Sequence, residues 1–110
     1  MNVDDYAAWA ARVARAQAAD PPDRERLSYL GLGLASEAGE VVDHIKKLLR
    51  DGDSAWRPDQ VAEELGDLAY YWAALCVAAG RNPSEILAAS QAKIEERIKL
   101  LPRSPAPPSG

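Results

Sequence analysis

The chain has 110 residues, of which 47% are hydrophobic and 27% are charged, as in a single small globular domain. Its net charge of −4 and the lack of a basic stripe argue against nucleic acid or an anionic membrane as the main partner. Because no apolar run reaches the ~20 residues that span a bilayer, and the first residues do not resemble a signal peptide, we expect a soluble, cytoplasmic protein.

Apolar residues recur at helical spacing through the first half of the chain. A first helix is predicted over about 3–18, and the prolines within 20–23 end it, since proline removes a backbone donor and clashes inside a helix. A long second helix is predicted over about 25–50, where apolar residues recur at threes, fours and sevens. The glycine within 51–53 stops it.

Two further helices are predicted in the second half. The third begins near Pro58, which suits a first helical turn, and runs to Gly80 as a C-terminal cap. The fourth begins with the sequence NPSE at 82–85, where an asparagine N-cap precedes a proline and a glutamate, and it continues to about Leu101.

The predicted fold class is therefore all-α, a four-helix bundle over residues 1–101. The short connection between the second and third helices favours an antiparallel pair. The segment 102–110 is rich in proline and serine and lacks core residues, so it is predicted to be a disordered tail.

Two pairs of carboxylates lie in the predicted second and third helices. Glu37 and Glu40 are three residues apart, and so are Glu64 and Asp67, so each pair shares a helix face. In an antiparallel arrangement all four can meet across one seam, where unneutralised charges would be strongly unfavourable. A hard divalent cation, Mg²⁺ or Mn²⁺, would resolve the repulsion. The alternative is a solvated or salt-bridged helix face.

A glycine precedes the second carboxylate of each pair. Gly39 and Gly66 each cost roughly 1 kcal/mol relative to alanine in a helix interior, so each position should serve a purpose. Two explanations stay open: the missing side chain lets helices approach closely, or it leaves space for a hydrated metal ion and phosphate.

These segments resemble a known family. The resemblance lies in "YLGLGLASEAGEVVDHIKKLLRDG" at 29–52 and "VAEELGDLAYYWAALCVAAGRNPSEI" at 61–86, which together hold an E-x-x-E…E-x-x-D signature. Over roughly residues 6–97 the chain is similar to the MazG-like nucleotide pyrophosphohydrolases of the all-α NTP pyrophosphatase superfamily.

The resemblance implies Mg²⁺-dependent cleavage of a nucleoside triphosphate between its α and β phosphates, giving a nucleoside monophosphate and pyrophosphate. The same oxygen ligands would also accept Mn²⁺ in place of Mg²⁺. By motif position the metal ligands, and with them the catalytic residues, would be Glu37, Glu40, Glu64 and Asp67. The physical logic agrees, because metal ions neutralise phosphate oxygens and activate water.

The chain departs from the family pattern at two positions. Some members have a glutamate, proposed as the base that activates water, where this chain has Ser36, so a metal-bound hydroxide or a ligand carboxylate must serve. The final helix often carries an asparagine three residues before a lysine, with an arginine following. Lys93 and Arg97 match that pattern, whereas Ser90 replaces the asparagine.

Several other residues are candidates for substrate binding, each with an ordinary structural alternative. Lys47 could reach a phosphate or be a plain surface lysine. Tyr71 could stack on a base or sugar, or pack in the core. Lys93 and Arg97 suit the β and γ phosphates but also have surface glutamates nearby. His44 is interpreted as an exposed or packed histidine rather than a group supporting the metal.

The thin, alanine-rich faces and the family resemblance together predict a homodimer or a dimer of dimers. The leading functional hypothesis is a house-cleaning hydrolase of the nucleotide pool. Two alternatives are kept: phosphoribosyl-ATP pyrophosphohydrolase, a superfamily relative, and a catalytically silent helical adaptor. The thermal stability of a silent adaptor should not change with millimolar Mg²⁺.

Overall fold

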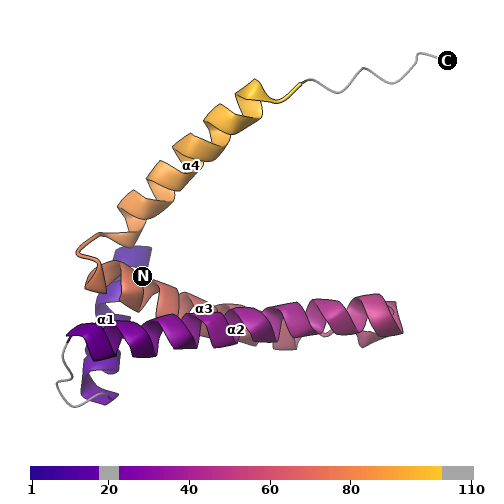
Figure 1. Cartoon of the computed structure of the whole chain (residues 1–110), viewed down its shortest axis with the longest axis horizontal. Coiled ribbons are helices and arrows are strands. Elements are labelled where there is room, and N and C mark those ends of the chain that lie inside the picture. Colours follow the sequence, from indigo (N-terminus) through magenta and orange to yellow (C-terminus); the bar gives the residue numbers. More distant parts are fainter. Residues whose placement is uncertain (18–22, 103–110) are drawn as a thin grey trace.

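The computed structural model of the protein describes residues 1–17 and 23–102 (Figure 1). The helices are α1 (Val3–Gln17), α2 (Asp23–Asp51), α3 (Pro58–Ala78) and α4 (Pro83–Leu100), with a short 3₁₀ turn, η1 (Asp53–Ala55), between α2 and α3. Over the described ranges there is no strand, so the all-α prediction is confirmed. Most of the predicted break at 20–23 and of the predicted tail at 102–110 lies outside these residues.

Glycine ends two of the helices, as the sequence indicates. After α3, the Gly80 N–H donates to the Val77 carbonyl at 2.9 Å and the Arg81 N–H to the Cys76 carbonyl at 3.0 Å, which is a Schellman motif. Gly80 has φ 71° and Gly52, just after α2, has φ 89°. A side chain at either position would be strained, so both turns require glycine.

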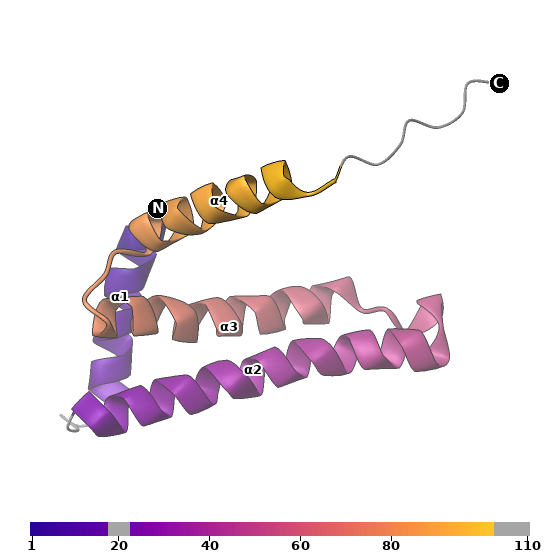
Figure 2. The same cartoon turned by 45° about the horizontal axis from the view of Figure 1, so that its top comes forward.

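The packed part of the molecule consists of α1, α2 and α3. Figure 2 shows α3 running back alongside α2, with α1 crossing the end where α2 begins and α3 finishes. The core beneath this crossing is built of small residues and one leucine: Ala7, Ala10, Ala14, Leu30, Ala73 and Ala74. Alanines at threes and fours on α1 form one smooth helix face, which lets the α1 and α3 backbones pack closely.

Helix α4 leaves this body as an arm (Figures 1 and 2). Its first turn is tied to α1, because Asp4 accepts hydrogen bonds from the Ser84 N–H at 2.9 Å and from the Ser84 hydroxyl at 2.6 Å. Every residue from 91 to 102 is exposed. The single chain therefore does not close a four-helix bundle.

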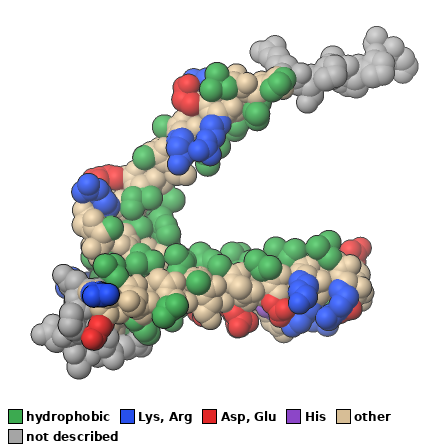
Figure 3. All heavy atoms as spheres, in the orientation of Figure 1, with side chains coloured by type: hydrophobic (Ala, Val, Ile, Leu, Met, Phe, Trp, Pro, Cys, Tyr) green, Lys and Arg blue, Asp and Glu red, His purple; other side chains and the backbone are tan. Residues whose placement is uncertain are grey.

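Large apolar side chains are exposed on the arm and on the body. On α4 they are Leu87, Ile94, Ile98 and Leu100; on α2 and α3 they include Leu32, Val42, Ile45, Leu49 and Leu65. Figure 3 shows hydrophobic side chains along the side of the body that faces α4 and on α4 itself. Among the described helices, none is both long and apolar enough to cross a membrane.

Candidate metal centre

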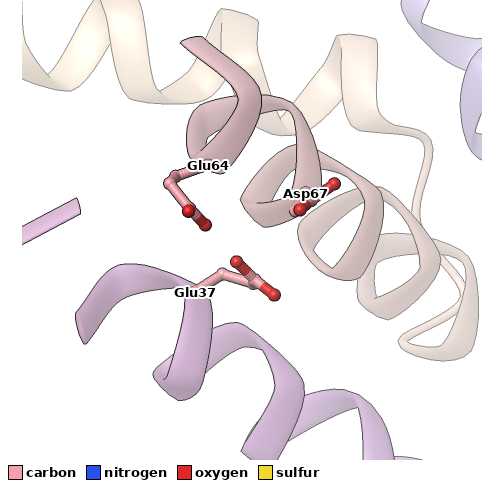
Figure 4. Close-up of side chains that lie close together, drawn as sticks. All are labelled: Glu37, Glu64 and Asp67. Atoms are coloured by element: carbon pink, nitrogen blue, oxygen red, sulfur yellow. The ribbon is translucent and has the colours of Figure 1, made fainter. Parts of the chain in front are cut away.

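Three carboxylates converge between α2 and α3. Glu37 extends from α2, and Glu64 and Asp67 extend from successive turns of α3 (Figure 4). One oxygen from each lies within 4.8 Å of the others. Glu37 and Glu64 are half-buried and Asp67 is exposed, so the group is embedded on one side and open on the other. We call these three residues the acidic cluster.

The fourth predicted carboxylate, Glu40, does not join the acidic cluster. Glu40 is exposed, and it is not in the group whose ligand oxygens lie within 4.8 Å of one another. The structure thus brings three of the four predicted carboxylates together, and the role of Glu40 as a ligand stays a prediction. The Glu40 charge still acts on the cluster, because it contributes to a raised pKa at Glu37.

The surroundings of Glu37 shift the pKa of its carboxyl group. Burial raises the pKa of Glu37, and so do a hydrogen bond shared with Glu64 and the negative charges of Asp67, Glu64 and Glu40. Its Oε2 atom is buried and has no hydrogen-bond partner among the described residues. A buried polar oxygen without a partner is costly, so the protein holds at this point an acceptor that a cation would satisfy.

The donor set decides which cation fits. The acidic cluster offers carboxylate oxygens alone, with no nitrogen or sulfur from the described part of the chain among the converging atoms. Oxygen ligands suit hard ions such as Mg²⁺ or Mn²⁺, whereas structural zinc prefers cysteine and histidine. Glu37, Glu64 and Asp67 are thus suited to hold a hard divalent cation.

His44 lies against the acidic cluster. Its Nε2 atom is 3.9 Å from Oε1 of Glu64, and its side chain is only 12% exposed. The low exposure agrees with the packed histidine of the sequence interpretation, which did not favour a contact with a carboxylate of the site. The available signal was the spacing, since His44 follows Glu37 by seven residues and therefore shares its face of α2.

The glycines beside the carboxylates do not mark a close helix contact. A Cβ atom added at Gly39 or Gly66 would meet nothing within 4 Å, so the explanation by close approach is wrong within one chain. Close approach occurs instead at Gly33, where an added Cβ would overlap the ring of Tyr71. Sequence reasoning did not single out Gly33.

Tyr71 connects the aromatic side chains to the acidic cluster. Its half-buried ring lies with its centroid 5.1 Å from that of Tyr70 and 6.0 Å from that of Tyr29. A hydrogen bond with Tyr29, burial and the nearby Glu37 charge raise the pKa of the Tyr71 hydroxyl. These contacts agree with the packing role that was the alternative to substrate stacking.

The predicted cationic residues are not gathered at the cluster in a single chain. Lys47 forms an ion pair with Asp43 at 3.1 Å, on the exposed side of α2. Lys93 and Arg97 lie on the exposed α4 arm, and α4 contacts α1 and α3 but not α2. Lys93 lines a shallow hollow made by residues of α4 alone.

Comparison with known proteins places the chain in a family. The model of the MazG nucleotide pyrophosphohydrolase domain matches residues 26–101, which include all of α3 and α4, most of α2 and the whole acidic cluster. The chain is also similar to "Gene 37 protein" of Mycobacterium phage L5, with 40% identity over 79 residues, covering 68% of this chain and 69% of that protein. No solved structure gives a significant match. Since the family match spans well over half of the chain, the protein belongs to the MazG nucleotide pyrophosphohydrolase domain family.

Proposed function

We propose that the protein is a Mg²⁺-dependent nucleoside triphosphate pyrophosphohydrolase acting on the nucleotide pool. It hydrolyses a (d)NTP between the α and β phosphates and releases a (d)NMP and pyrophosphate, with one water consumed. The observation that carries the proposal is the convergence of Glu37, Glu64 and Asp67 in a chain of this family. A helix pair without such a role gains nothing from three carboxylates that repel one another.

Each carboxylate of the site has a proposed role. Glu37, Glu64 and Asp67 would hold the cation. Glu40 is proposed as a further ligand because it occupies the matching position of the family motif and its charge acts on Glu37. A divalent cation held by these residues would neutralise phosphate oxygens and lower the barrier to attack by water. A bound cation would favour the ionised Glu37 carboxylate and would therefore act against the raised pKa of this group. Asp67 is exposed, so the substrate phosphates approach from its side.

We further propose that the protein is a homodimer. Leu87, Ile94, Ile98 and Leu100 of α4 are exposed in the described chain, and a second copy carries a matching apolar surface on α2 and α3. Association also gives Lys93 and Arg97 a way to act on phosphates, since one chain does not bring them to its own acidic cluster. Sedimentation at micromolar concentration should show a dimer or larger species, and a strictly monomeric profile would contradict this part of the proposal.

The activity is tested with a nucleotide panel of common NTPs and dNTPs, dUTP, oxidised and deaminated forms, and phosphoribosyl-ATP. Each is incubated with Mg²⁺ or chelator, and the products are separated by anion exchange. The informative variant is Glu64→Gln, and the matched control is Glu63→Gln, an exposed neighbour on the same helix. We expect monophosphate and pyrophosphate from the wild type and the control, and loss of both from Glu64→Gln.

Other products would refute parts of the proposal. Diphosphate and phosphate would show that the wrong bond was assigned. Turnover of phosphoribosyl-ATP alone would identify the relative from histidine synthesis. A folded protein that turns over no nucleotide, and whose melting temperature ignores millimolar Mg²⁺, would favour the silent adaptor.

A further inference from the structure

His44 occupies a defined place beside the acidic cluster. It extends from the face of α2 that carries Glu37, two turns further along, toward Glu64 on α3. Its Nε2 atom is 3.9 Å from the Glu64 Oε1 atom, and both side chains are largely shielded from water, at 12% and 23% exposure. Glu64 thus interacts with both Glu37 and His44.

The geometry argues against His44 as a ligand of the same cation. The group whose ligand atoms all lie within 4.8 Å of one another contains Glu37, Glu64 and Asp67, and His44 is not a member. Asp43, its neighbour on α2, forms its own ion pair with Lys47 at 3.1 Å, and the His44 charge contributes only a further lowering of the Asp43 pKa. Among the residues of the acidic cluster, Glu64 is therefore the one that His44 contacts.

We propose that His44 is a positioning residue: its Nε2–H orients the Glu64 carboxylate toward the divalent cation, an inference that rests on the proposed function. A separation of 3.9 Å is longer than a hydrogen bond. The last torsion of a glutamate side chain is soft, however, so the carboxylate is free to rotate toward the ring. Groups that hydrogen-bond to a ligating carboxylate fix its orientation, and their loss typically weakens metal binding about 10–100-fold.

Two substitutions at one position test the proposal. His44→Leu fills similar space without a donor, whereas His44→Gln retains an N–H at nearly the same reach. Mn²⁺ binding to the full chain is measured from the EPR signal of the free ion, and Lys46→Gln, an exposed neighbour, serves as control. We expect about 10–100-fold weaker binding for His44→Leu, with His44→Gln closer to wild type. In turnover, the Mg²⁺ requirement should rise for His44→Leu while kcat at saturating Mg²⁺ largely recovers.

The outcomes separate this inference from the proposed function. If the wild type binds Mn²⁺ and His44→Leu binds it equally well, the positioning role is refuted and the hydrolase proposal stands. If His44→Gln is as weak as His44→Leu, a donor is not what the site requires, and the inference also fails. A folded wild type that binds no Mn²⁺ would refute both proposals. Melting temperatures without metal show whether any variant has simply lost its fold.

Discussion

Alanine substitution at three glycines on the α2–α3 pair should have opposite effects on stability. Glycine to alanine in a helix interior gains roughly 1 kcal/mol of unfolding free energy. At Gly39 and Gly66 an added Cβ meets nothing within 4 Å, so this gain should appear in full. At Gly33 the Cβ overlaps the Tyr71 ring, and overpacking typically costs about 1–3 kcal/mol. The net change for Gly33→Ala is then between about zero and a loss of 2 kcal/mol.

A double-mutant cycle isolates the cause. Urea unfolding, followed by circular dichroism, gives the unfolding free energy of each variant. In a Tyr71→Leu background the ring is gone, so Gly33→Ala should now stabilise by roughly 1 kcal/mol, as Gly66→Ala does in the wild type. Equal gains from Gly33→Ala and Gly66→Ala in the wild-type background would refute the steric reasoning.

The proposed dimer offers a further test of the alanine variants at Gly39 and Gly66. The open space at Gly39 and Gly66 is a property of one chain. If either alanine variant is destabilised, and more strongly at high protein concentration, a second copy packs against that glycine in the dimer. Sedimentation of the same variants shows whether association has weakened.

Three further results are expected. Leu30→Ala should lose about 2–5 kcal/mol of unfolding free energy, because Leu30 is the large side chain at the centre of an alanine-rich core and is 1% exposed. Hydrogen bonds from Ser84 lower the pKa of Asp4, so the attachment of α4 should be complete above the ordinary value of 3.8 and weaken as pH falls through the lowered pKa. Hydrogen exchange at the start of α4 measures this, and Asp4→Asn should exchange faster than Asp5→Asn at neutral pH. The raised pKa of Glu37 means that the ion-free protein binds more protons folded than unfolded. Its stability should therefore fall as pH rises from 4.5 through that pKa, and Glu37→Gln should flatten the pH profile of melting and abolish stabilisation by Mg²⁺.

Local chemistry was sufficient to predict the helices. Proline at the start of α3 and α4, and glycine after α2 and α3, act through backbone geometry that needs no distant partner, so the helix bounds follow from the sequence. The spacing of Glu64 and Asp67 likewise places both on one side of α3, whatever packs against it.

The tertiary structure decided which groups meet. Glu37 joins the α3 carboxylates and Glu40 does not, because the exact rotation of α2 against α3 selects which of two neighbouring residues faces the seam. The same rotation brings His44 to Glu64 and the Tyr71 ring onto Gly33, contacts between residues far apart in sequence. The sequence by itself determined the helices, their caps and the presence of paired acids. Only packing determined that α4 stands away from the body and that three carboxylates form the cluster, because both depend on long-range contacts that helical periodicity does not encode.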